Sequence, residues 1–509
     1  MQNALSTLEK YKSAKAELQA RIIENESFFN MRYQVSGNTH NTDKTAWLFN
    51  CIANKHADAM DSQPQASVLP REESDSKTAQ MLSDILPVIL ENNRFAKSYS
   101  DGWWRKLKAG TAVYSAIFNP SKKGGDIEIR LVDILNLYWE PGVCDIQDSK
   151  NVFCVKLWDN DKLLERYPDI TLSKNAYEAT AFVFDKSVDT SDKTVVIDWY
   201  YKKKGRLHLC KIAAEQILFS SENQKGFENG FYAHAQYPFV FDPMYPQKDS
   251  PAGFSLIDVL KSNQLYIDKL NSIILDNAAL CAKKRFFIKD MSGINEEEFR
   301  DWSNELIHCT SVNLGSDSIR ELEISPLPSA TLGFLQQKID ELKEVSGNRD
   351  VSSGGITGGV TAASAIAALQ EAGSKLSRDM ISSSFLAFEK LLLMVLELVR
   401  QFYSDERVFR ITAPNGEVRF EKFSGKALRG ARVLGISQRE PVFDIKVVAH
   451  KASPFSRISH NELAKELYAL GIFLPQNIAQ AKLMLSMMDF EGKEILLRKL
   501  ENMQTGNAQ

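Results

Sequence analysis

Residues 251–283 read PAGFSLIDVLKSNQLYIDKLNSIILDNAALCAK, and this stretch predicts one long helix. After Pro251 the chain runs for about thirty residues without another proline, which favours an unbroken helix. Apolar residues recur along it at alternating spacings of four and three: Leu256, Leu260, Ile267, Leu270 and Ile274. Asn263 and Asn277 interrupt this stripe. At 1.5 Å per residue the helix would be about 45 Å long, and such a helix usually packs beside others like it.

A compact insert follows the long helix before the chain returns. We expect a strand at Phe286–Ile288, a helix from Glu296 to Cys309 and a second strand near Ser311–Leu314. A helical pattern from Thr331 to Ser346 then leads back. The insert therefore lies between two helices that are expected to pack together.

The next segment, 348–364, reads NRDVSSGGITGGVTAAS and contains four glycines. It is not a Walker A loop, because Gly359 is followed by Val360-Thr361 instead of Lys-Ser or Lys-Thr. It is not a dinucleotide fingerprint either, because Ile356 stands where that motif has its second glycine. A surface linker, or a loop whose backbone approaches a ligand, remains open.

The rest of the chain divides into helical and β-rich parts. A helix is expected from Ala362 to about Tyr403, with a kink at Gly373-Ser374. The other predicted helices are within 1–60 and at 75–92, 98–108, 161–166 and 460–502; the predicted strands are 66–69, 112–118, 127–131, 152–157, 195–200, 408–412 and 442–450. The basic run Lys202–Arg206 falls at an expected hairpin turn, where a solvated turn is favoured over a phosphate contact.

Length and composition set the class of protein. The 509 residues predict two to four domains, and a net charge of -3 does not suit a general nucleic-acid binder. The six scattered cysteines form no CxxC pair, so we expect free thiols and a reducing compartment. The N-terminus has no secretion signal. The most apolar run, Leu391–Val399, is too short to span a bilayer, so the sequence predicts a soluble, intracellular protein.

No set of residues predicts an enzyme. The seven histidines are dispersed, and neither HExxH nor GxSxG occurs. His308-Cys309 is the only adjacent pair of possible metal ligands, and an ordinary helix face explains it better. Glu72-Glu73 and Glu296–Glu298 are interpreted as exposed helix charges. We therefore expect no catalytic residues, no bound metal and no cofactor.

The order of elements resembles the portal proteins of tailed bacteriophages: long helix, compact insert, returning helix, glycine segment, long kinked helix. The local sequence supports this resemblance at 237–240 (YPFV), 245–258 (YPQKDSPAGFSLID), 264–270 (QLYIDKL) and 276–278 (DNA). Residues 47–61 and 139–142 are similar to a branch found in phages and prophages of gut bacteria. The likeness covers about 440 residues and rests on the order of segments.

The resemblance implies an α+β, mainly α, portal fold. Its expected parts are a wing at 1–253 and 362–454, stem helices at 254–283 and 329–347, a clip at 284–328, a tunnel loop at 348–361 and a crown at 455–509. The chain would form a ring, usually of twelve subunits, at one capsid vertex in the virion, after assembly in the host cytoplasm. Double-stranded DNA would pass through it. Terminase, capsid or scaffolding protein, adaptor and tail proteins would be its partners, with no membrane involved.

The resemblance also places candidate functional residues. The tunnel loop would contribute Arg349, Asp350, Ser352, Ser353, Gly354, Gly355, Thr357, Gly358 and Gly359 to the channel. The returning helix would present Lys338, Asp340, Glu341, Lys343 and Glu344 to the DNA, although a solvated face or intersubunit ion pairs explain these charges equally well. The clip would use Glu296, Glu297, Glu298, Arg300 and Trp302 to bind partners. The uncharged tip of the loop, 352–359, favours a steric collar over an electrostatic grip.

Two other readings remain open at this stage. The first is another head-tail structural protein, such as an adaptor or scaffold, which ring stoichiometry and an axial channel would distinguish from a portal. The second is a metal-dependent nucleic-acid enzyme, which divalent-metal binding would reveal.

Overall fold

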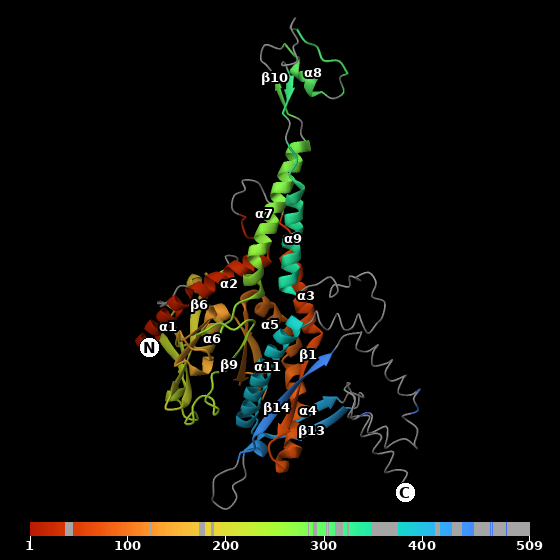
Figure 1. Cartoon of the computed structure of the whole chain (residues 1–509). Helices are drawn as coiled ribbons and strands as arrows, with labels where there is room; N and C mark the ends of the chain where they lie inside the picture. The colour runs from red at the N-terminus through yellow and green to blue at the C-terminus, as the bar shows by residue number, and fades with distance from the viewer. Residues whose placement is uncertain are drawn as a thin grey trace, which may run out of the picture.

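The computed structural model describes residues 1–35, 44–122, 124–172, 179–184, 188–282, 285–288, 293–301, 303, 305–310, 319–322, 325–347, 375–412, 418–429, 440–451, 469, 471 and 485. Figure 1 shows a broad body from which a long pair of helices projects, with a small folded tip at its far end. Of the described residues, about 48% are in helices and about 25% are in strands. The predicted mixed α+β fold is confirmed, with helix about twice as abundant as strand.

The N-terminal part of the body is helical, as predicted. Its elements are α1 (Gln2–Ala14), α2 (Ala16–Phe29), α3 (Trp47–Met60), β1 (Ser62–Pro70), α4 (Ser76–Asn92) and α5 (Phe95–Ala109). The apolar faces of α3, α4 and α5 enter one large core, in which Ile52, Leu82 and Trp103 are buried. Helix α5 ends at Gly110, whose φ of 82° is the left-handed conformation that glycine adopts most easily.

Two antiparallel sheets follow. One has the order β3-β2-β9 and contains β2 (Thr111–Asn119), β3 (Asp126–Val132) and β9 (Phe239–Pro243). The other runs β4 to β8 in chain order: β4 (Leu137–Trp139), β5 (Asn151–Asp159), β6 (Lys193–Lys203), β7 (Arg206–Ala213) and β8 (Gln216–Ser220). Helix α1 packs on one face of the larger sheet. Leu163 of α6 (Asn160–Arg166) and Ile170 form a second small core with Val196.

The basic run Lys202–Arg206 is a hairpin turn, as predicted. Lys203 pairs with Arg206, and Lys204 and Gly205 between them have φ of 51° and 74°. Two positive φ angles in a two-residue loop match the twist of the flanking strands. Lys203 forms an ion pair with Glu222 at 2.5 Å. The turn is thus held by contacts within its own sheet.

The C-terminal half returns into the same body. It contains α11 (Lys375–Phe402), β12 (Arg407–Thr412), β13 (Val418–Phe423) and β14 (Phe443–Lys451). Strand β14 pairs with β1 along its whole length, from Ser62 opposite Lys451 to Pro70 opposite Phe443. Because 62–70 and 443–451 share one sheet, the two ends of the described chain belong to one folded unit.

Helix α11 is the central helix of the body. It packs against β2, β9 and β14, and Leu392, Val395 and Leu398 on it are fully buried. The most apolar run of the sequence is therefore core. No helix in the described part of the chain is long and apolar enough to cross a membrane. Cys144 and Cys154, which could have paired, are both free thiols.

A buried ion pair joins three elements of the body. The ammonium of Lys106 on α5 lies 2.7 Å from Asp242 Oδ1 on β9. It also donates to Ser384 Oγ on α11 at 2.7 Å, and Ser384 Oγ donates to Asp242 Oδ2 at 2.7 Å. Lys106 and Asp242 are 0% and 2% exposed. This pair was not predicted, because its members lie 136 residues apart in the sequence.

The projecting part comprises α7 (Leu256–Ala282) and α9 (Ser329–Ser346), which we call the stem hairpin. The described residues of 285–322, which we call the tip, contain β10 (Phe286–Ile288), α8 (Glu296–Arg300) and β11 (Ile319–Glu321). Strand β10 pairs antiparallel with β11. The helices predicted from Pro251 to Lys283 and from Thr331 to Ser346 are confirmed, as is the strand at 286–288. The strand expected near 311–314 lies outside the described residues.

One helix of the tip was predicted wrongly. The sequence pattern predicts a helix from Glu296 to Cys309, but α8 ends at Arg300. Asp301 Oδ1 accepts hydrogen bonds from Ser303 N and Oγ at 3.0 and 2.6 Å, and this local turn competes with helix. Cys309 instead forms a β-bridge with Ile294.

Other differences are smaller. Strands β4, β8, β9, β11 and β13 were not predicted; each is only three to six residues long, which leaves too short an alternation to recognise. The kink expected at 373–374 and the N-terminal part of that helix, 362–374, lie outside the described residues. So does the helical tail at 460–502, apart from positions 469, 471 and 485.

Candidate functional site

The stem hairpin is the feature that distinguishes this molecule from a compact enzyme. Helices α7 and α9 pack side by side and carry the tip away from the body (Figure 1). Of the predicted stripe on α7, Leu256, Leu260 and Ile267 are buried, whereas Leu270 and Ile274 are only half-buried. The near half of α7 is thus anchored in the body, and the far half packs against α9.

A buried polar network fixes the base of α7. Gln264 and Asp268, one helical turn apart, are 1% and 0% exposed. Asp268 Oδ1 accepts from Thr45 N at 2.9 Å and Thr45 Oγ1 at 2.7 Å, while Asp268 Oδ2 accepts from the hydroxyl of Tyr33. Gln264 Oε1 accepts from Leu48 N at 2.9 Å. Polar groups this deeply buried are stable only when they are hydrogen-bonded, as these are.

The network sets the protonation of Tyr33 and caps the N-terminus of α3. Burial, and then the hydrogen bond to Asp268, raise the pKa of Tyr33, so its hydroxyl remains a donor throughout the physiological range. Leu48 N belongs to the first turn of α3, which has no cap from its own N-cap residue, Ala46. Gln264 therefore supplies from another helix the acceptor that a helix N-terminus lacks.

The two asparagines that interrupt the apolar stripe hold the hairpin together. Asn277 Oδ1 accepts from Leu327 N at 3.1 Å, and Asn277 Nδ2 donates to Ser325 O at 3.4 Å. These bonds attach the chain entering α9 to the far half of α7. Asn263 hydrogen-bonds Glu341 on α9. The interruptions are thus contacts between the two stem helices.

The predicted charges of the returning helix all lie on α9. Lys338 donates to Glu341 Oε2 at 2.7 Å, and its ammonium lies 5.8 Å from the ring centre of Tyr266 on α7. The hydrogen bond from Lys338 lowers the pKa of Glu341. Lys343 lies 5.6 Å from the ring centre of Trp47 at the start of α3. These three residues are thus engaged within the chain, and the predicted roles of these charges toward DNA or a neighbouring subunit stay predictions.

Two of the predicted charges are more open. Asp340 and Glu344, one turn apart on α9, are exposed. Asp340 accepts from Gln336 Nε2 at 2.9 Å. Among the predicted stem charges, the exposed face of α9 is therefore acidic, a property that suits a surface along which DNA moves without strong binding.

The predicted charges of the tip are held by local contacts. Asn295 Oδ1 caps α8 by accepting from Glu297 N at 3.1 Å and Glu298 N at 3.4 Å. Glu296 lies 3.5 Å from Arg300. His308 N and Nδ1 lie 2.7 and 2.9 Å from Glu298 Oε2, and these contacts lower the pKa of Glu298.

Two expectations for the tip have other outcomes. The interpretation of His308 and Cys309 as neighbours on a helix face is wrong, because His308 turns back to Glu298 and Cys309 is paired with Ile294. Trp302 lies outside the described residues. All nine predicted residues of the tunnel loop, within 349–359, lie outside them as well.

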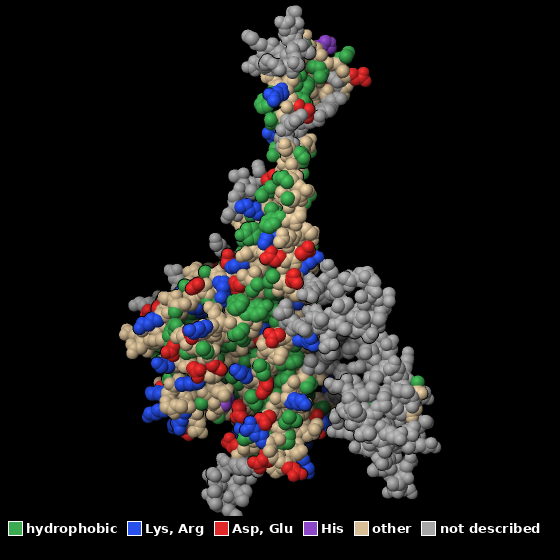
Figure 2. All heavy atoms as spheres, viewed as in Figure 1, with side chains coloured by type: hydrophobic (Ala, Val, Ile, Leu, Met, Phe, Trp, Pro, Cys, Tyr) green, Lys and Arg blue, Asp and Glu red, His purple; other side chains and the backbone are tan. Residues whose placement is uncertain are grey.

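The stem hairpin and tip expose large apolar side chains. On the stem hairpin these are Tyr266, Ile273, Leu275, Leu280, Leu332, Phe334 and Val345; on the tip they are Phe287, Leu306, Ile307 and Leu322. Figure 2 shows apolar groups along the length of the projection. Tyr266, Leu275 and Leu332 are each more than half exposed. Exposed apolar side chains of this size and number are typical of a surface that binds protein.

Comparison with protein families decides the class. The model of the phage P22-like portal protein family matches residues 56–238 and 201–509, which overlap and together cover most of the chain. The chain belongs to this portal family. A comparison with curated proteins gives no match. The family consists of structural head-tail connectors that act in DNA packaging, and it is not enzymatic. The enzyme alternative is thereby excluded, and the portal reading prevails over an adaptor or scaffold.

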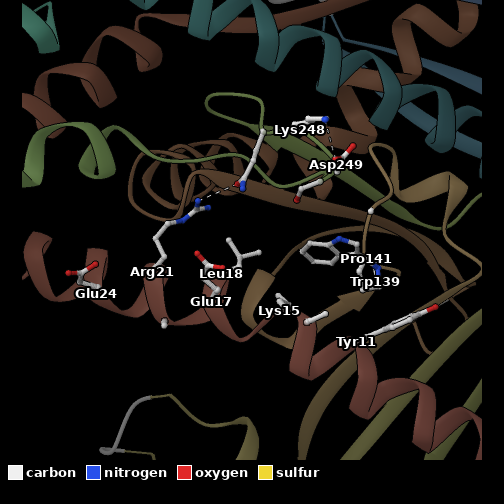
Figure 3. Close-up of a pocket in the computed structure, with 15 residues that line it drawn as sticks. Tyr11, Lys15, Glu17, Leu18, Arg21, Glu24, Trp139, Pro141, Lys248 and Asp249 are labelled. Carbon is white, nitrogen blue, oxygen red and sulfur yellow. Dashed lines mark hydrogen bonds and ion pairs between the residues drawn. The ribbon is translucent and has the colours of Figure 1, made fainter.

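One pocket of the body lies beside the N-terminal helices. It has a volume of about 680 Å³ and lies between α1–α2, the turn after β4 and residues 247–250. Figure 3 shows Tyr11, Trp139 and Pro141 at one end and Arg21 and Glu24 at the other. Arg21 Nη2 donates to Gly253 O at 2.8 Å. Its lining mixes both signs of charge without a nucleophile beside a base.

Lys15, beneath this pocket, has a structural role. Its ammonium donates to Leu137 O at 2.5 Å and to Ile134 O, and lies 4.6 Å from the ring centre of Tyr138. Burial lowers the pKa of Lys15 to about 7. The carbonyl oxygens and the ring face favour the cation and fasten α1 and α2 to β4. Among the described residues, no group of three or more His, Cys, Asp or Glu side chains could hold a metal ion.

The residues that organise the stem base were not recognised from the sequence as a site. Gln264 and Asp268 did carry a signal, because they are polar residues one turn apart on the same face as Leu260 and Ile267. A polar pair inside an apolar stripe indicates a buried network. Their partners, Tyr33 and Thr45, are more than 200 residues away and had no such signal.

Proposed function

We propose that the chain assembles into a closed ring of about twelve subunits that occupies one vertex of a phage capsid. Double-stranded DNA passes through the central channel during packaging and ejection, without sequence-specific contacts. The family match supports the portal role. The observation that carries the ring is the exposed apolar surface of the stem hairpin, which includes Tyr266, Leu275 and Leu332. In a ring, one face of each hairpin meets a different face of the next.

The parts of the molecule have assigned roles in this proposal. The wing is 1–253 with 362–454, the stem is 254–283 with 329–347, and the crown is 455–509. The clip, 284–328, first contacts the terminase ATPase and later the head-completion adaptor, using the exposed tip around Phe287, Leu306 and α8. The wing contacts the capsid or scaffolding protein, and tail proteins join below the adaptor. The protein is made in the host cytoplasm and ends in the virion.

The DNA channel is lined by the stem and the tunnel loop, 348–361. Asp340 and Glu344 support this, because an acidic or neutral wall lets a phosphate backbone slide, whereas a basic wall would bind it by counterion release. Lys338 forms an ion pair with Glu341, so this lysine does not offer the DNA a strong phosphate contact. The motor force comes from the terminase, and this chain hydrolyses nothing.

The ring is tested by native mass spectrometry of the full chain, expressed with its capsid and scaffolding proteins. The expected particle is about 690 kDa for twelve copies of 57.4 kDa. Leu275→Glu should abolish it, because a charge would be buried in the interface. Leu164→Glu, at an exposed leucine of α6, is the matched control and should leave the ring intact. A wild-type chain that stays monomeric beside its partners would contradict the proposal.

A further inference from the structure

Helix α3 contacts the stem hairpin at its N-terminal end. Leu48 N in its first turn is bound by Gln264 of α7, and Thr45 just before it is bound by Asp268. Trp47, the first residue of α3, faces Lys343 near the end of α9. The N-terminal end of α3 therefore touches both stem helices, close to the point where α9 ends at Ser346.

The C-terminal half of α3 contacts α11. Lys55 Nζ donates to Ser377 Oγ at 2.9 Å, and Ser377 Oγ donates to Asp58 Oδ2 at 2.7 Å. Lys55 also lies 3.7 Å from Asp58, and its side chain is only 2% exposed. Ser377 lies in the first described turn of α11 (Lys375–Phe402). One serine hydroxyl thus links a buried cation and a carboxylate of α3 to α11.

The body supports α3 between these two ends. His56 stacks on Trp104 of α5, with ring centres 4.0 Å apart and planes 13° apart. Its Nε2 lies 3.1 Å from Ser100 Oγ. Cys51 and Ile52 are buried in the main core. Because α3 is packed along its length, it cannot bend easily at its centre, and a displacement at one end is passed to the other.

We propose that α3 is a strut that couples the base of the stem to the first described turn of α11. The contacts at Leu48 and at Lys55 are seven residues, or about 10 Å of helix, apart. Residues 348–374 connect α9 to α11, so α3 fixes the spacing of the two points from which that segment leaves. This relay rests on the proposed function for its use: a stem displaced by DNA or by a partner at the tip shifts the start of α11.

Coupling between the two ends can be measured by a double-mutant cycle. Gln264→Leu removes the acceptor for Leu48 N, and Ser377→Ala removes the hydroxyl at Lys55 and Asp58. The readout is hydrogen exchange of the amides of 375–384 in the full-length protein. Ser377→Ala should accelerate this exchange about tenfold or more, the effect of losing hydrogen bonds to charged groups. Gln264→Leu, on another helix, should accelerate it about threefold.

The cycle separates a strut from two independent contacts. Sites this far apart normally contribute additively. If α3 is a strut, releasing one end already weakens the contact at the other end. The exchange rate of 375–384 in the double variant should therefore be at least about threefold lower than the product of the two single effects predicts. The control cycle uses exposed serines on α7 and α11, the two helices that carry Gln264 and Ser377. Ser262→Ala with Ser382→Ala should leave the exchange of 375–384 unchanged.

Three results would overturn the strut. One is exchange at 375–384 that stays at the wild-type level in Gln264→Leu, another is additivity within about twofold, and the third is acceleration spread evenly over the chain. If Gln264→Leu does not fold, Thr45→Val replaces it, because it removes only the hydroxyl bonded to Asp268. Ser377→Thr keeps a hydroxyl and should restore protection. These outcomes do not depend on ring formation, so the strut and the ring can fail separately.

Discussion

The body and the stem hairpin use apolar and polar residues in opposite ways. In the body, α11 buries Leu392 and Val395 completely, and even the charges of Lys106 and Asp242 are inside and paired. On the stem hairpin, Leu275 and Leu332 are more than half exposed. These residues of the body are thus satisfied within one chain.

The difference indicates which surfaces the chain completes alone. Helix α7 contains both situations, since Leu260 near the body is 0% exposed and Leu275 farther out is 52% exposed. Folding of the single chain explains the apolar residue at Leu260, which is buried, but not the one at Leu275, which is exposed. Exposed leucines on a two-helix projection cost little in the isolated chain and become favourable when a second copy covers them. The far half of the stem hairpin is therefore the surface that a neighbouring copy would cover in the proposed ring.

The largest effect is expected from breaking the buried pair of the body. Lys106→Met leaves Asp242 buried without its cation and should lower the free energy of unfolding by about 3–5 kcal/mol. Lys108→Met on the same helix removes an ion pair with Glu26 at 2.9 Å that is partly exposed, and should cost less than about 1 kcal/mol. Urea unfolding followed by circular dichroism measures both. Equal losses would show that the body does not depend on its buried charges.

The next effect compares the two halves of α7 directly. Leu260→Ala should lower the free energy of unfolding by about 2–5 kcal/mol, because it creates a cavity in the core. Leu275→Ala should change it by no more than about 0.5 kcal/mol in the unassembled chain. The measurement is chemical unfolding at a concentration where the protein is monomeric. Similar losses at both positions would mean that the far half of α7 is packed within the subunit.

A smaller effect is expected at the stem base. Asp268→Asn keeps the shape of the side chain but replaces one acceptor oxygen by a donor, facing Tyr33 or Thr45, and should cost about 1–3 kcal/mol. Asp276→Asn, at an exposed position on the same helix, is the control and should be neutral. Thermal unfolding by calorimetry measures the two variants. If Asp268→Asn leaves the stability unchanged, the polar network does not fix the base of the stem.

The smallest effect is a pH dependence of the body. Burial lowers the pKa of His234 to about 4. The unfolded chain therefore binds the proton more readily between about pH 6.5 and pH 4, and stability falls as the pH drops through that window. The loss from pH 7 to pH 5 should be about 1–2 kcal/mol. His234→Gln should flatten this part of the pH profile, and a profile identical to the wild type would exclude His234 as its source.

The sequence predicted what is periodic and local. The stripe beginning at Leu256, the returning helix and the turn at Lys204-Gly205 were all recognisable, because helix periodicity and turn chemistry operate within a few residues. The helix expected to reach Cys309 failed, because Asp301 and Ser303 form a competing turn that a helical pattern conceals.

Contacts between distant parts of the chain were not predictable in the same way. Tyr33 with Asp268, and Lys55 with Ser377, are 235 and 322 residues apart. Each residue by itself is compatible with an exposed helix face. The portal reading came from the order of segments, which the family match later supported, and not from any residue of the stem base.

Cryo-electron microscopy of the purified full chain, viewed down the particle axis, tests the central claim most directly. The account predicts a closed ring of about twelve subunits in which neighbouring stem hairpins cover Leu275 and Leu332, around a channel wide enough for duplex DNA. A closed particle without an axial channel, or a ring in which these leucines face solvent, would contradict it.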